Sequence, residues 1–76
     1  MKKYDLDARF DKRKSFYGKA KTEVLSDGTI NLYSYGVLVS QIKNGILTHL
    51  GKWSMTTSRH QREFEKQYEA GEEFTY

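Results

Sequence analysis

The chain contains no cysteine and no proline, and it has no long hydrophobic run. Without cysteine there is no disulfide framework and no cysteine-ligated zinc site. The residues that follow Lys2 and Lys3 are mixed and mostly polar, so we expect neither a signal peptide nor a membrane-spanning segment. Together these absences predict a cytoplasmic protein.

The chain's 76 residues are enough for one domain with a single core. A chain of this length has a free energy of unfolding of about 4 to 11 kcal/mol, so the loss of one core side chain removes a large share of it. Its 13 basic and 10 acidic residues are unevenly spread, with lysine and arginine concentrated near the N-terminus and glutamate near the C-terminus. This bipolar pattern suits contact with a nucleic acid, or with a protein that carries matching charged patches.

Glycine-containing dipeptides divide the chain into strands. Asp27-Gly28 and Asn44-Gly45 predict tight hairpin turns, because such pairs accept the positive φ angles that these turns require. Side chains alternate between apolar or small and polar types over residues 16–24 and 29–35, which is the period of a half-covered strand.

Two more strands complete the predicted sheet. Residues 37–42 are apolar and β-branched, and residues 46–53 follow the second hairpin turn. Gly36 predicts a turn or bulge between the second and third strands. The sequence therefore predicts four antiparallel strands in meander order.

A serine- and threonine-rich stretch predicts the start of a helix. Ser58 can cap it in a capping box with Gln61, and Thr56 is an equally good cap. Gly71 predicts its end. One aromatic ring per turn then falls on a single face, from residues spaced four apart: His60, Phe64 and Tyr68.

These elements predict an α+β fold, a four-stranded antiparallel meander sheet packed by one C-terminal α-helix. The predicted parts are a basic N-terminal segment at 1–15, the meander at 16–53, the helix at 56–71 and a loose tail at 72–76. The segment 1–15 either adds a strand or wraps the sheet, and the register of the third strand stays open. The predicted core residues are Phe16, Val24, Ile30, Leu32, Val39, Ile42, Leu50, Trp53 and Phe64.

Three short motifs carry a resemblance: SFYGKA at residues 15–20, YSY at 33–35 and WS-x-TT-x-RH-x-x-EF at 53–64. With these motifs, the chain resembles a group of short, uncharacterised proteins from phages and mobile elements of Gram-positive bacteria. The likeness covers about residues 12 to 68. This resemblance implies a mobile-element origin and implies no particular biochemical activity.

Tyrosines and lysines would lie together on the wet face of the predicted sheet, aromatic rings beside positive charges. Exposed rings can stack on bases while neighbouring lysines meet phosphates, which is how some sheets bind single-stranded nucleic acid. Cross-strand tyrosines also commonly pair to shelter a sheet, so a structural role is the alternative. The residues of this candidate face are Tyr17, Lys19, Lys21, Tyr33 and Tyr35.

Two further clusters could bind an anion. The first is a basic run that would contact phosphates or an acidic protein patch, or would simply be solvated surface: Arg9, Lys12, Arg13 and Lys14. The second is the helix start, where Thr57, Arg59 and His60 could hold a phosphate or carboxylate. Capping together with a histidine packed beneath the sheet is its plainer explanation.

The sequence lacks the common catalytic motifs. The two histidines, His49 and His60, have no cysteine nucleophile, no G-x-S-x-G elbow and no matched carboxylate spacing beside them. We therefore expect no enzyme, no cofactor and no metal.

The leading hypothesis is stoichiometric binding to a host protein, as an inhibitor of a nucleic-acid-handling or defence protein. The alternative is a nucleic-acid-binding module that uses the Tyr/Lys sheet face. A homodimer through exposed strand edges is a third alternative, which the mass in solution would test.

Overall fold

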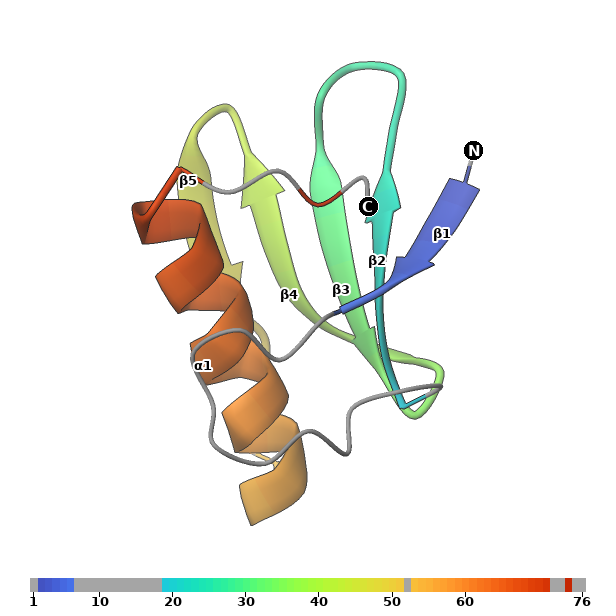
Figure 1. Ribbon diagram of the computed structural model, residues 1–76, viewed down its shortest axis with the longest axis vertical. Helices are drawn as coiled ribbons and strands as arrows, with labels where there is room; N and C mark the ends of the chain where they lie inside the picture. The colour runs from blue at the N-terminus through green and yellow to red at the C-terminus, as the bar shows by residue number, and fades with distance from the viewer. Residues whose placement is uncertain (1, 7–18, 52, 72–73, 75–76) are drawn as a thin grey trace.

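The computed structural model describes residues 2–6, 19–51, 53–71 and 74, and in these residues five strands form one antiparallel sheet with one helix packed on it (Figure 1). The strands are neighbours in chain order. The elements are β1 (Lys2–Asp5), β2 (Ala20–Val24), β3 (Ile30–Ser34), β4 (Val37–Lys43), β5 (Ile46–His49) and α1 (Met55–Glu69). The α+β meander with a C-terminal helix is thus confirmed.

The predicted number of strands was wrong, because the N-terminal segment adds β1 to the free edge of β2. Tyr4 lies opposite Thr22 in this antiparallel pair. Leu6 then continues the pairing through its N–H, which donates to the Ala20 carbonyl at 2.8 Å, and its side chain is buried. The short, lysine-rich β1 has no apolar alternation, so its pairing depends on the unpaired backbone groups of β2 rather than on a local pattern.

Both predicted hairpin turns are confirmed. In the first, Gly28 has φ 91° and donates its N–H to the Leu25 carbonyl at 3.0 Å. In the second, Asn44 and Gly45 have φ 54° and 75°, the left-handed pair that a tight primed turn requires. The β3–β4 turn has the same form, with Tyr35 as well as Gly36 at positive φ.

A β-bulge interrupts the pairing of β3 with β4. Leu32 lies opposite Ser40, but the next residue, Tyr33, lies opposite Leu38, which leaves Val39 as the extra residue. Both Val39 and Ser40 are therefore buried, although they are neighbours in the chain. The bulge fixes the register of β4, which could not be derived from the sequence.

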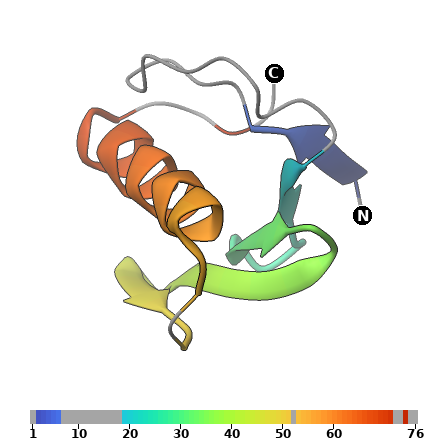
Figure 2. The ribbon, with the colours of Figure 1, turned by 90° about the horizontal axis from the view of Figure 1, so that it is seen from below.

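The helix covers one face of the sheet, as Figure 2 shows in the view from below. Its His60 and Phe64 are fully buried and Tyr68 is partly buried, so the predicted aromatic stripe does face the sheet. The buried apolar side chains of the described residues are Leu6, Ala20, Leu32, Val39, Ile42, Phe64 and Phe74. Burial of this apolar surface is the main favourable contribution to folding.

Part of the predicted core was wrong. Leu50 and Trp53 are 36% and 42% exposed, because β5 ends at His49 and both residues lie in the connection to the helix. Val24 and Ile30 are only partly buried. Phe16 lies outside the described residues.

Phe74, the one described residue of the predicted loose tail 72–76, is packed into the core. The Phe74 side chain is 3% exposed, and its ring centroid lies 4.8 Å from that of Phe64. Its carbonyl also accepts the Thr22 hydroxyl at 3.2 Å. Five residues are too few for a periodic signal, so only packing reveals the role of Phe74.

The helix begins one turn earlier than a cap at Ser58 would allow. Ser54 has extended backbone angles, and its Oγ accepts the Thr57 N–H at 3.4 Å, so Ser54 is the N-cap in place of Ser58 or Thr56. At the other end, the Gly71 N–H donates to the Tyr68 carbonyl at 3.1 Å with φ 75°. The predicted glycine stop is therefore confirmed.

We expect Ser54→Ala to lower the free energy of unfolding by about 0.5 to 1 kcal/mol, the lower part of the range for N-caps, because the capping hydrogen bond is long. Thr56→Ala is the matched control, and it should be neutral or slightly stabilising because alanine has the higher helix propensity. Urea unfolding followed by circular dichroism measures both. Equal losses in the two variants would contradict the cap assignment.

Candidate functional site

Two residues of the predicted Tyr/Lys face do lie together on the side of the sheet away from α1. Lys21 and Tyr33 are directly opposite each other on β2 and β3. Ala20 and Thr22, on either side of Lys21, are buried toward the helix, so Lys21 projects to the open face. Lys19 is exposed just before β2, and Tyr17 lies outside the described residues.

Tyr35 does not share that face. It occupies the first position of the β3–β4 turn with φ 52°, so the period-two alternation of β3 ends before it. Its ring centroid is 5.9 Å from that of His60, on the inner face of the helix. A stacking platform formed by Tyr33 with Tyr35 is therefore not present.

A row of polar side chains crosses the open face beneath Tyr33. The Tyr33 hydroxyl donates to Glu23 Oε1 at 2.9 Å, and Asn31 Nδ2 donates to the same oxygen at 3.4 Å. Gln41 Nε2 donates to Asn31 Oδ1 at 2.9 Å, extending the row onto β4. The hydrogen bond to Glu23 raises the pKa of Tyr33, and burial and the charge of Glu23 raise it further. A carboxylate at this place disfavours an approaching phosphate.

We expect the pKa of Tyr33 to lie above that of an ordinary tyrosine, because ionisation would place a phenolate next to the Glu23 carboxylate. Since its folded-state pKa is raised, the interaction stabilises the fold below the ordinary tyrosine pKa, and that contribution is lost as the pH rises through the folded-state pKa. Phenolate absorbance measures the titration. The chain has six tyrosines, so the signal of a Tyr33→Phe variant must be subtracted. Glu23→Gln should move the Tyr33 pKa back down; no movement would rule out Glu23 as the cause.

The predicted anion site at the helix start is occupied by internal contacts. The Ser34 hydroxyl lies 3.0 Å from Thr57 Oγ1 and 2.7 Å from His60 Nδ1, and all three residues are buried. These bonds join the first helical turns to the end of β3. Arg59, the third residue of the predicted site, is half-buried. The geometry matches the plainer explanation, a histidine packed beneath the sheet.

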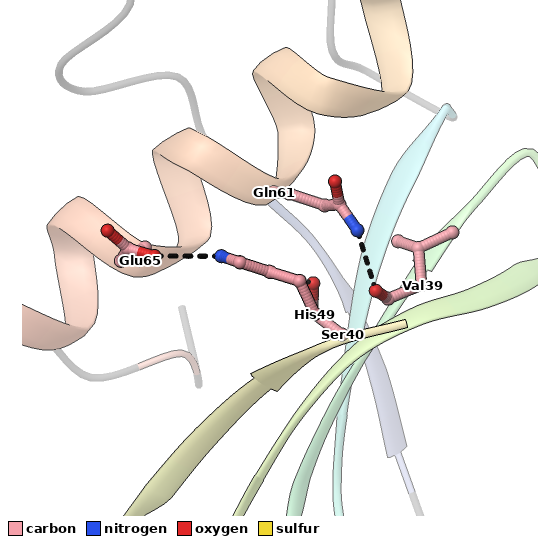
Figure 3. Close-up of polar contacts among 5 residues, drawn as sticks. All are labelled: Val39, Ser40, His49, Gln61 and Glu65. Atoms are coloured by element: carbon pink, nitrogen blue, oxygen red, sulfur yellow. Dashed lines mark hydrogen bonds and ion pairs between the residues drawn. The ribbon is translucent and has the colours of Figure 1, made fainter. Parts of the chain in front are cut away.

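One polar constellation was missed by the sequence reasoning: Ser40, His49 and Glu65 form a connected chain (Figure 3). Ser40 Oγ lies 2.7 Å from His49 Nδ1, and His49 Nε2 donates to Glu65 Oε1 at 2.8 Å. A carboxylate only accepts, so Nε2 carries a proton, and in the neutral ring Nδ1 accepts the serine hydroxyl. The three residues come from β4, the end of β5 and α1, so no local sequence motif predicts that they meet.

This chain of groups has the composition of a serine hydrolase triad but not its accessibility. Ser40 is 0% exposed, so no substrate carbonyl can reach its hydroxyl. Close by, Gln61 Nε2 donates to the Val39 carbonyl at 2.8 Å, so the bulge is also bonded to the helix (Figure 3). The arrangement fastens α1 and β5 to the bulge.

The basic run Arg9, Lys12, Arg13 and Lys14 lies outside the described residues. In the part of the chain that the structure describes, no group of three or more His, Cys, Asp or Glu residues is placed to hold a metal ion. No helix among these residues is long and apolar enough to cross a membrane.

Large apolar side chains are exposed at one end of the sheet. The β3–β4 turn and the connection from β5 to α1 both lie at this end, the lower end in Figure 1. We call this group the apolar end; its members are Tyr35, Val37, Leu50, Trp53 and Met55, which are 57%, 46%, 36%, 42% and 86% exposed. The sequence reasoning placed Leu50 and Trp53 in the core, so this surface was missed.

A family model matches residues 4–75, nearly the whole chain. The chain belongs to the family of unknown function DUF8033. No curated protein and no solved structure matches it. The family has no assigned activity, so any function must be argued from the surfaces described above.

Proposed function

We propose that this DUF8033 protein is a phage or mobile-element accessory protein that acts without catalysis. It binds a host protein in stoichiometric amounts and inhibits a nucleic-acid-handling or defence protein. The mobile-element origin rests on the resemblance of its SFYGKA, YSY and WS-x-TT-x-RH-x-x-EF motifs. The binding role rests on the surface of the domain.

The apolar end is the observation that carries the proposal. Singly exposed apolar side chains are normal, but five at one end of a small sheet offer apolar surface that a protein partner could cover. Trp53 and Tyr35 are also the residue types most often found as anchors in protein interfaces. With Ser40 inaccessible, the Ser40, His49 and Glu65 chain supports no competing hydrolytic role.

Direct nucleic-acid binding through the open face is the weaker alternative. The Lys21 and Tyr33 pair favours it, since a ring beside a cation suits a base and its phosphate. Glu23 beneath Tyr33 opposes it, and Tyr35 adds no second ring to the platform. The balance favours a protein partner.

A pull-down with the full chain as bait from lysate of a Gram-positive host tests the proposal. We expect one host protein recovered in stoichiometric amount, and a complex of the two purified proteins in size-exclusion chromatography. Recovery of nothing stoichiometric would count against the proposal. A gel shift with single- and double-stranded oligonucleotides covers the alternative, which requires binding that weakens with salt and is lost in Tyr33→Ala.

A further inference from the structure

We propose that the outer edge of β5 binds an extended segment of the partner protein, which adds to the sheet as a further strand. This inference rests on the proposed function and names how the partner is bound. Three observations carry it: the hydrogen-bond pattern of β5, the absence of charge along this strand, and the exposed apolar side chains at its two ends.

The hydrogen-bond pattern of β5 shows which backbone groups face outward. Ile46 directly follows a two-residue turn, and a residue in that place bonds back to the preceding strand. The Leu50 N–H donates to the Val39 carbonyl at 2.8 Å, so it also points toward β4. Bonding alternates along an antiparallel ladder, so Leu47 and His49 direct their N–H and C=O groups away from β4. Among the described residues, no strand pairs with this outer edge.

The two edges of the sheet differ in charge. At one edge, β1 has the sequence Lys-Lys-Tyr-Asp, and charged residues on an edge strand discourage the addition of another chain. At the other edge, β5 has the sequence Ile-Leu-Thr-His, without Lys, Arg, Asp or Glu. The β5 edge therefore lacks this protection, and an uncharged segment suits it best.

Exposed apolar side chains lie at both ends of β5 on the open face of the sheet. Thr48 lies opposite Gln41, whose side chain belongs to the polar row of that face. Because side chains alternate along a strand, Ile46 and Leu50 project to the same face as Thr48. They are 66% and 36% exposed. An added strand with apolar side chains four positions apart would cover both, and it would continue into the apolar end through Leu50.

A second copy of this chain is a poorer occupant, because the C-terminal half of α1 lies over β5 (Figures 1 and 2). The Tyr68 hydroxyl donates to the Gly45 carbonyl at 3.0 Å, and Glu65 accepts the His49 N–H at 2.8 Å. Two β5 strands paired about a two-fold axis would lie about 4.8 Å apart. The helices above them would then be closer than the roughly 8 to 10 Å that helix packing requires. A single extended segment brings no helix with it.

A nucleic acid also fits this edge less well than an extended peptide. Phosphate oxygens only accept hydrogen bonds, so they would leave the outward carbonyls of Leu47 and His49 without donors. A peptide backbone presents donors and acceptors in alternation and satisfies both kinds of group.

Selection from a random linear peptide library displayed on phage, with the full chain as bait, tests the inference. We expect enriched peptides to carry β-branched or apolar residues at alternate positions, with no proline between them, because such residues favour an added strand. One enriched peptide is then synthesised and serves as the probe in the measurements that follow.

Amide hydrogen exchange followed by NMR shows whether the peptide bonds to the backbone of β5. In the protein alone, the Leu47 and His49 amides should exchange faster than those of Thr48 and Leu50, which point toward β4. With the peptide bound, exchange at Leu47 and His49 should slow by about tenfold or more, since both amides then donate to the peptide. Docking through side chains alone would leave these two amides unchanged.

A matched pair of variants locates the binding edge. Thr48→Lys places a charge in the middle of β5, the change that discourages strand addition, and we expect Kd for the peptide to rise about tenfold. Ser26→Lys replaces a hydroxyl side chain with lysine in the β2–β3 turn, and its Kd should stay within about twofold of the wild type. Both positions are exposed, and circular dichroism verifies that both variants fold.

Four results would overturn the inference. They are no enrichment above bare resin, unchanged exchange at Leu47 and His49 in the complex, equal affinity for the wild type and Thr48→Lys, and a dimeric mass with these amides already protected in the protein alone. The last result would make a second copy the occupant.

The same measurements separate this inference from the proposed function. If a stoichiometric host complex forms without protecting the Leu47 and His49 amides, the proposed function stands and strand addition is wrong. If the peptide protects these amides but the pull-down recovers no host protein, the β5 site stands and the proposed function is wrong.

Discussion

Phe64→Ala is expected to lower the free energy of unfolding by about 3 to 5 kcal/mol, the usual cost of truncating a buried phenylalanine. The Phe64 side chain is 0% exposed and its ring packs against Phe74. The whole free energy of unfolding of a chain of this length is about 4 to 11 kcal/mol, so the variant should be barely stable or unfolded. The cost combines lost burial with the cavity that remains beneath the helix.

Urea unfolding followed by far-ultraviolet circular dichroism measures this loss. Phe64→Leu is a milder second variant, which should still fold and give a measurable midpoint if Phe64→Ala does not. Met55→Ala is the control from the same helix, because Met55 is 86% exposed and its truncation should change stability by less than about 0.5 kcal/mol. A Phe64→Ala midpoint equal to that of Met55→Ala would be incompatible with the described core.

Phe74→Ala should cost about 3 kcal/mol, although Phe74 lies in a stretch that the sequence predicts to be a loose tail. Its ring is nearly as buried as that of Phe64, and its carbonyl accepts the Thr22 hydroxyl. Trp53→Ala is the informative comparison. Trp53 was expected in the core but is 42% exposed, so its loss should cost clearly less than that of Phe74.

The same unfolding measurement decides between the two accounts. If Trp53→Ala is the more damaging variant, the sequence-based core is correct and the exposed position of Trp53 is wrong. If Phe74→Ala leaves stability unchanged, the tail is not anchored. Because Phe64 and Phe74 are in contact, the two alanine substitutions should not add, and the double variant should lose less than the sum.

Local chemistry made much of the fold predictable. The turns at Asp27-Gly28 and Asn44-Gly45 follow from backbone angles that only a few residue types tolerate. The stripe of His60, Phe64 and Tyr68 follows from the helical period. Both signals depend on residues a few positions apart, so they can be read without knowing the rest of the structure.

The candidate surfaces were much less predictable. Tyr33 and Tyr35 are two residues apart, which would place them on one face of a continuous strand, but the turn begins at Tyr35 and sends its ring toward His60. The Ser40, His49 and Glu65 chain joins three elements through a bulge. A bulge depends on how two strands and a helix pack together, so the contacts made at it cannot be predicted from a short sequence motif.

The amino-acid sequence alone determined the antiparallel meander, its two glycine hairpins, the amphipathic helix and its glycine stop, since each follows from local propensity and periodicity. Only the tertiary structure decided that β1 pairs with β2, that Phe74 is buried while Trp53 is exposed, and that Met55 and Val37 lie at the same end of the sheet. Burial and proximity depend on contacts between residues far apart in the chain. The apolar end therefore becomes visible only when the strands and the helix are in place.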